Sequence, residues 1–310
     1  MHSDLFFDSI KGVKNRLQIL QRIIAVLLSS VSVLTAFLGN LSFEKYDIYE
    51  DLVYGEAERN IMDIYVPESA YSNEHNGVIL YIHGGSWTSG KKEDMSARCK
   101  RFAKKGYITA TMNYTLYADG LFGKVTALTM CDEIDLAIDR IKSFSEEKDL
   151  NINKLAVSGY SAGAHLSMLY GFSRADKSSI ELVFTANQVG PSDFHAEVWG
   201  STGLASMLSG IEITEEMINN GKAEEVINLV SPTAYVTEKT VPSILAYGGT
   251  DMIVPSGNAE RIKEAFENAG AEHSYILYPL SNHGLGLDPL CEMEYTNTVE
   301  QYCKDYFGYR

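Results

Sequence analysis

The sequence predicts an α/β fold, with a mostly parallel, twisted sheet that carries helices on both faces. Three observations predict it. Short apolar runs alternate with helical hydrophobic patterns along most of the chain. The runs are followed by glycine-rich or polar turns, where the carboxyl ends of parallel strands present functional residues. No internal repeat and no Pro- or Ser-rich linker divides the 310 residues, which favours a single catalytic domain.

The elements follow from these patterns in chain order. Residues 44–66 are expected to form opening antiparallel strands. Continuous apolar runs predict buried strands, and apolar residues at helical spacing predict the helices between them. The expected strands are 77–82, 107–112, 154–157, 182–189, 243–247 and 274–278, and the expected helices are 93–105, 127–144, 162–171, 258–269 and 293–306.

Residues 191–232 break the alternation of strands and helices. They are rich in serine, glycine and acidic residues and contain only short helical patterns. In open α/β sheets the ligand lies outside the carboxyl ends of the strands. We therefore predict that residues 191–232 form a small cap insertion over those ends, within a catalytic domain of residues 44–310.

The composition excludes several classes of protein. Hydrophobic residues make up 45% of the chain and charged residues 22%, as in ordinary globular domains. The formal net charge of −15 argues against a nucleic-acid partner, because phosphate binding needs clustered cations. The four cysteines show no CxxC spacing and are expected to be free thiols. We predict neither a metal nor an organic cofactor.

Residues 1–43 form a separate N-terminal segment in this prediction. No charged residue occurs from Ile23 to Phe43, and four cations precede this run. A membrane span needs about 20 mostly apolar residues, so the run is long enough for a membrane contact through residues 23–41. With the cations on the cytoplasmic side, the rest of the chain is exported, either anchored or secreted after cleavage. The alternative is a cytoplasmic protein whose apolar helix packs on its own domain.

A G-x-S-x-G pattern follows the expected strand 154–157. It centres on Ser161 and is flanked by Gly159 and Gly163. A sharp strand-to-helix turn would push Ser161 into a strained backbone conformation, and the crowding there requires very small neighbours. Between a strand and a helix the pattern predicts a nucleophilic serine, whereas a glycine-rich turn with a merely structural serine is the alternative.

A His-Gly-Gly-Ser-Trp motif, residues 83–87, follows the expected strand 77–82. Two adjacent glycines after a strand let backbone N–H groups approach an oxyanion. With the amide of Ala162, those of Gly84 and Gly85 are expected to form a cradle for a tetrahedral intermediate.

A serine hydroxyl needs a base, and the base needs an orienting acid. Asp251 follows the expected strand 243–247, and His283 follows the strand 274–278, in the order that this arrangement requires after Ser161. The sequence therefore predicts Asp251 as the acid and His283 as the base.

Two residues of the insertion are the alternatives for these roles. His195 is the rival base and Asp193 the rival acid, because both lie after the strand that ends at residue 189. We expect His165, one helical turn after the serine, to be a hydrogen-bonded interior histidine, and His83 to brace its own loop.

With these motifs the chain resembles the α/β-hydrolase superfamily over residues 46–308, and within it the carboxylesterase branch. That branch includes hormone-sensitive-lipase-like esterases and bacterial feruloyl- or acetyl-esterase-like proteins. The resemblance implies a sheet of about eight strands. Ser86 stands where many relatives carry a third glycine, and Tyr160 stands where some carry aspartate, which favours the feruloyl- or acetyl-esterase-like group.

The resemblance implies a serine esterase that forms an acyl-enzyme on short-acyl esters, with acylated carbohydrates among the expected substrates. An amide hydrolase, such as an arylformamidase or peptidase, is the alternative on the same residues. A binding module built on this fold would be expected to lack one of the three. We expect the substrate to contact Trp87, Tyr160 and Trp199. Trp87 and Tyr160 belong to the two motifs, and Trp199 lies in the predicted cap.

Overall fold

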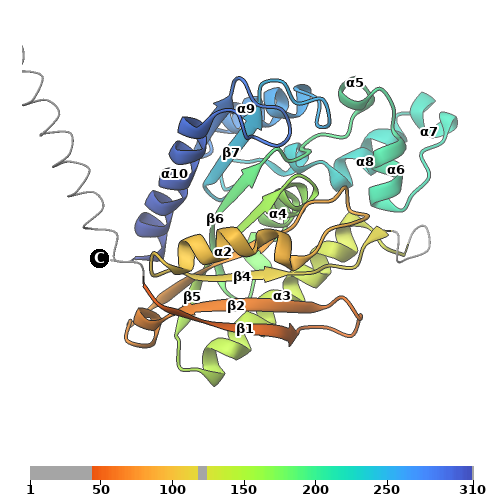
Figure 1. The fold of residues 1–310 in the computed structure, drawn as a ribbon. Coiled ribbons are helices and arrows are strands. Elements are labelled where there is room, and N and C mark those ends of the chain that lie inside the picture. Colours follow the sequence, from red (N-terminus) through yellow and green to blue (C-terminus); the bar gives the residue numbers. More distant parts are fainter. Residues whose placement is uncertain (1–43, 118–123, 309–310) are drawn as a thin grey trace, which may run out of the picture. The chain divides into compact units, whose positions relative to one another are not determined.

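The computed structural model describes residues 44–117 and 124–308. Its strands form one sheet of eight, in the order β1-β2-β4-β3-β5-β6-β7-β8 (Figure 1). The β1–β2 and β2–β4 pairs are antiparallel and all other neighbours are parallel, which confirms the predicted fold. The strands are β1 (Tyr46–Val53), β2 (Ile61–Pro67), β3 (Asn76–Ile82), β4 (Ile108–Met112), β5 (Ile152–Tyr160), β6 (Glu181–Gln188), β7 (Ser243–Gly248) and β8 (His273–Tyr278).

Helices cover both faces of the sheet, because alternate strand residues are apolar on each side. On β5, Leu155 and Val157 pack with α3 (Ala127–Glu147) and α4 (Ala162–Ser173). Ala156 points to the opposite face. The helices of that face are α2 (Ser96–Ala103) and α10 (Pro289–Phe307), whereas α9 (Gly257–Ala269) lies on the same face as α3 and α4.

Several boundaries differ from the sequence prediction. Strand β5 runs from Ile152 to Tyr160, because pairing with β3 and β6 on both sides extends it through polar residues. Residues 92–95 form a 3-10 turn before α2, and α10 begins at Pro289, a residue that suits the first helical turn. The 3-10 helices are η1 (Glu68–Tyr71), η2 (Lys92–Met95), η4 (Ala175–Lys177) and η5 (Pro232–Tyr235).

Four short helices lie between β6 and β7, in the segment predicted as a cap. They gather beyond one end of the sheet (Figure 1), and α6 packs on α8 through buried apolar side chains. They are α5 (Ala196–Trp199), α6 (Gly203–Ser209), α7 (Glu215–Asn219) and α8 (Lys222–Val230).

The predicted N-terminal segment 1–43, with its apolar run 23–41, lies outside the described residues, so its boundary stays a prediction. Among the residues that the structure describes, no helix is both long and apolar enough to cross a membrane.

Strand register brings distant loops together. Ile82, the last residue of β3, pairs with Gly159 of β5. The loop that follows β3 therefore leaves the sheet beside Ser161. Gly248 at the end of β7 pairs with Tyr278 at the end of β8, so the loops that carry Asp251 and His283 are also neighbours.

Two histidines are buried inside this framework. His165 on α4 is fully buried; its Nδ1 accepts a hydrogen bond from Trp87 Nε1 (3.1 Å), and its Nε2 donates to the carbonyl of Val230 (2.8 Å). His83 stacks on a tyrosine ring, and its Nδ1 donates to the Gly84 carbonyl (2.7 Å). Burial lowers the pKa of each histidine to about 4, although the backbone hydrogen bonds partly oppose it.

The burial of these two neutral histidines predicts that the folded protein loses stability in acid. The unfolded chain binds protons at both histidines below about pH 6.5, whereas the folded protein binds them only near pH 4. The free energy of unfolding should therefore fall as pH drops from 6.5 to 4, by about 1.4 kcal/mol per histidine and pH unit at most.

Urea unfolding at several pH values between 7.5 and 4.5 measures this loss. His165→Gln lowers stability at neutral pH, but its stability should fall with a smaller slope, because one titrating group is gone. An unchanged slope would contradict the assignment of His165 as a neutral buried group.

Candidate active site

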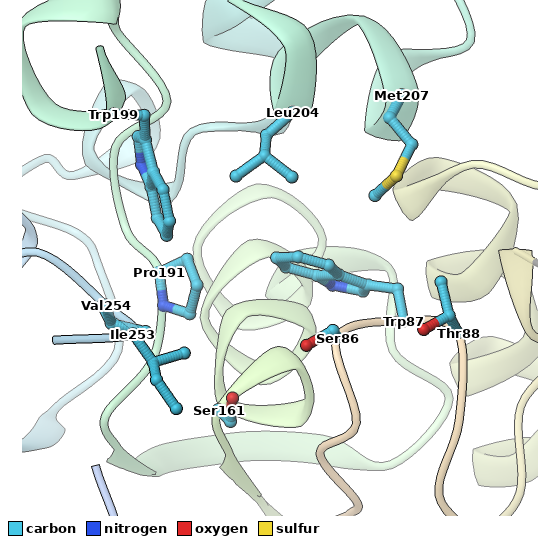
Figure 2. Close-up of a pocket in the computed structure, with 10 residues that line it drawn as sticks. All are labelled: Ser86, Trp87, Thr88, Ser161, Pro191, Trp199, Leu204, Met207, Ile253 and Val254. Carbon is cyan, nitrogen blue, oxygen red and sulfur yellow. The ribbon is translucent and has the colours of Figure 1, made fainter. Parts of the chain in front are cut away.

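Ser161 lies at the sharp turn between β5 and α4. Its backbone has φ 55° and ψ −121°, a conformation that non-glycine residues adopt at a cost of about 1–3 kcal/mol. The turn aims the side chain out of the sheet, at the N-terminus of α4, and Figure 2 shows its hydroxyl pointing into a pocket. This is the strained serine that the G-x-S-x-G pattern predicts.

The two flanking glycines permit this turn. A Cβ on Gly163 would lie 2.1 Å from the carbonyl oxygen of Ile82, and a Cβ on Gly159 would lie 2.2 Å from the carbonyl of Gly163. Both contacts are with backbone, which has little freedom to move. Any side chain at these positions would push α4 away from the ends of β3 and β5.

His283 connects Ser161 to Asp251. Its Nε2 lies 2.9 Å from Ser161 Oγ, and its Nδ1 lies 2.7 Å from Asp251 Oδ2. The carboxylate accepts from Nδ1–H, so the lone pair of Nε2 is free to accept the serine proton. The structure therefore brings together the three side chains that the sequence predicts as a catalytic group.

The Asp251 carboxylate is held in place by three hydrogen-bond donors, His283 and two backbone amides. Its side chain is only 4% exposed, and Oδ1 accepts the backbone N–H groups of Ile253 (2.8 Å) and Val254 (3.0 Å). Burial raises the pKa of Asp251, but the hydrogen bonds from His283 and from the two amides outweigh it and hold the pKa below its ordinary value. Asp251 thus stays ionised at neutral pH and fixes the orientation of the imidazole ring.

Backbone amides face the same region. The Cβ position of Gly84 lies 3.2 Å from the Cβ of Ser161, so this part of the β3 loop touches the serine. Ala162 is the first residue of α4, where amides have no partner within the helix. Within residues 44–117 and 124–308, the amides of Gly84, Gly85 and Ala162 donate to no acceptor. They are available to a ligand oxygen, as the sequence predicts.

The loop that carries these amides is strained. Gly85, Ser86 and Trp87 have φ values of 111°, 53° and 61° in succession. Such values cost energy at the two non-glycine positions. The buried Trp87 ring and its hydrogen bond to His165 anchor the loop against α4.

The rival residues form a separate group. His195 Nδ1 lies 2.8 Å from Asp193 Oδ1, and Arg261 binds the other carboxylate oxygen at 3.2 Å. Neither His195 nor Asp193 contacts Ser161, whose hydroxyl is bound to His283. This cluster instead supports the cap, since Trp199 Nε1 donates to the carbonyl of Asp193 (2.6 Å).

A pocket of about 320 Å³ opens above Ser161 (Figure 2). Trp87 and Trp199 line it, as predicted, and α6 of the cap points Leu204 and Met207 into it. The sequence did not identify its other lining residues, which lie in loops after strands: Ser86, Thr88, Pro191, Ile253 and Val254.

Tyr160 lies on a different side of the site. Its hydroxyl donates to the carbonyl of His283, and it lines a second, more polar pocket of about 580 Å³. The sequence missed this pocket, because its charged members lie on η2 (Asp94) and α2 (Arg98) rather than after a strand. It is lined by Gly84, Gly85, Ser89, Gly90, Asp94, Met95, Arg98, Tyr160 and Gly284.

The described residues offer no cluster of metal-binding side chains. In the described part of the chain, no three His, Cys, Asp or Glu side chains are grouped to hold an ion. The four cysteines are free thiols.

The contact of Gly163 with Ile82 yields a test. Gly163→Ala should strongly reduce ester hydrolysis by the folded protein and lower its melting temperature, because the added methyl group meets backbone. Gly286→Ala is the matched control, since a Cβ there meets open space. If the two variants behave alike, the close approach does not shape the site.

The comparisons with known proteins agree with this geometry. The BD-FAE family model matches residues 62–266. A probable isoprenylcysteine alpha-carbonyl methylesterase of Oryza sativa subsp. japonica is 22% identical over 253 residues, covering 78% of this chain and 58% of that protein. A kynurenine formamidase of Danio rerio is 22% identical over 258 residues, covering 80% and 78%.

A solved structure gives the same fold. A truncated form of a carbohydrate esterase from gut microbiota matches with a TM-score of 0.68 and 18% identity, over 85% of this chain and 98% of that one. The chain spans about three fifths of the length of the plant methylesterases that it matches. On the family match, the chain belongs to the BD-FAE family of α/β-hydrolase esterases.

Proposed function

We propose that this protein is a serine carboxylesterase that hydrolyses short-acyl esters through an acyl-enzyme on Ser161. The contacts of His283, 2.9 Å from Ser161 Oγ and 2.7 Å from Asp251 Oδ2, carry the proposal. They supply a weak nucleophile with a base, and the base with an orienting anion.

In the first step, Ser161 Oγ attacks the ester carbonyl while His283 Nε2 takes its proton. The carbonyl oxygen becomes an oxyanion, and the amides of Gly84, Gly85 and Ala162 are placed to donate to it. One such donor is worth about 10²–10³ in rate. His283 then gives its proton to the departing alkoxide, and the acyl group remains on the serine.

In the second step, water replaces the alcohol. His283 removes a proton from the water as it attacks the acyl carbonyl, and returns it to Ser161 Oγ as the acid leaves. Asp251 remains ionised throughout, which stabilises the imidazolium in both steps. The net reaction consumes one ester and one water and yields an acid and an alcohol.

The pocket above Ser161 suits the acyl group. Its walls are the rings of Trp87 and Trp199 and the side chains of Leu204 and Met207, so it favours an apolar chain. The alcohol is proposed to come from an acylated carbohydrate, because a carbohydrate esterase from gut microbiota shares this fold. Amide hydrolysis is the second candidate, since a kynurenine formamidase is among the relatives.

The location of the protein is also a proposal. The uncharged run of residues 23–41, preceded by cations, supports export with the N-terminal segment as an anchor or signal. Extracellular acylated carbohydrates would be accessible to such an enzyme.

Hydrolysis of p-nitrophenyl acetate, butyrate and octanoate by the full chain tests the proposed function. Ser161→Ala should lower kcat by about 10⁶, to the background that binding alone supports. Ser173→Ala, on the same helix, should stay near the native rate. If Ser161→Ala keeps the native rate, the proposed nucleophile is wrong.

4-Nitroacetanilide, the amide that corresponds to p-nitrophenyl acetate, separates ester from amide hydrolysis. We expect the p-nitrophenyl ester to be cleaved far faster than 4-nitroacetanilide, because 4-nitrophenolate is a better leaving group than 4-nitroaniline. An amide that is hydrolysed as fast as the ester would make the amide hydrolase the better description.

A further inference from the structure

The polar pocket contains a cation, Arg98, for which the described residues supply no salt-bridge partner. Arg98 is half-buried on α2, and its guanidinium lies 5.5 Å from the centre of the Tyr160 ring. Its Nη1 donates to the side-chain oxygen of Gln188, a neutral amide. In the described part of the chain Arg98 makes no ion pair, although the protein carries an excess of acidic residues.

The neighbouring carboxylates do not neutralise Arg98. Glu292 accepts from Arg101 at one oxygen (3.1 Å) and from Gln188 at the other (3.1 Å). Asp94 lines the same pocket but is exposed to water, and it accepts the backbone N–H of Lys91 (3.0 Å). A guanidinium has five N–H donors, so most of those on Arg98 remain available to a ligand.

The position of the pocket indicates which part of a substrate enters it. His283 must deliver its proton to the leaving oxygen, so the alcohol lies beside His283. Gly284, the next residue, lines the polar pocket, and so does Tyr160, whose ring meets the His283 ring edge-on at 5.8 Å. The apolar pocket, which other residues of the β3 loop line, is left for the acyl chain.

We propose that Arg98 selects substrates whose alcohol part carries a carboxylate, such as an acylated sugar acid. The proposal rests on the esterase function above. A planar carboxylate matches the fork of a guanidinium and would supply the charge that the protein does not. A half-buried cation that lacks an anion in the free protein gains most from a ligand that brings one.

A matched pair of substrates tests this specificity. 4-Acetoxybenzoate carries a carboxylate on its leaving group, and its methyl ester is the neutral analogue. The ratio of their kcat/KM values is compared between proteins, so the intrinsic reactivities of the two substrates cancel. Arg98→Gln should lower this ratio about 10–100-fold, the worth of a charged hydrogen bond.

Two variants serve as controls. Lys100→Gln removes a positive charge from the exposed side of the same helix and should leave the ratio unchanged. Arg98→Lys keeps the charge but loses the planar fork, so its ratio should fall between those of the native protein and Arg98→Gln. Circular dichroism checks that each variant is folded.

The native protein provides a second readout, which holds even if Arg98→Gln fails to fold. 4-Hydroxybenzoate should inhibit the hydrolysis of p-nitrophenyl acetate at a concentration at least about tenfold lower than methyl 4-hydroxybenzoate does. Equal inhibition by the two, or a substrate ratio that Arg98→Gln leaves unchanged, overturns the proposal. If the native protein cleaves no ester at all, the proposed function itself fails.

Discussion

The close approach of α4 to the end of β3 is the constraint on which the site depends. Gly163 lies so near the carbonyl of Ile82 that even one methyl group would collide with it. This contact holds Ser161 in its strained turn and places the β3 loop against the serine. The loop is strained as well, and Trp87 anchors it through the buried His165. Helix, nucleophile and amides thus form one rigid unit.

Two pockets with different linings adjoin the β3 loop. The apolar pocket combines residues of the β3 loop with α6 of the cap, whereas the polar pocket combines the same loop with α2. The cap therefore shapes the apolar pocket, which the proposed function assigns to the acyl group. Arg98 and Tyr160 shape the polar pocket, which the further inference assigns to the alcohol part.

The sequence predicted the sheet and its antiparallel opening. It also predicted Ser161, Asp251 and His283, because each lies in a loop that follows a strand, where parallel sheets place their ligands. Arg98 was not predicted. It lies on a helix, and its proximity to Tyr160 depends on how α2 packs against the sheet. The apolar residues Leu204 and Met207 of the cap suit either a pocket wall or the packing of the cap, and only the folded cap decides that they line the pocket. Such contacts join residues far apart in the chain, and no local pattern records them.

Covalent labelling tests the central claim most directly, namely that His283 and Asp251 activate Ser161. An aryl fluorophosphonate phosphonylates a serine only when a base removes its proton. Mass spectrometry of the labelled full chain should find one phosphonyl group, on the peptide that contains Ser161, and Asp251→Asn should slow labelling strongly while leaving the protein folded. Labelling of another serine, or an unchanged rate in Asp251→Asn, would contradict the account.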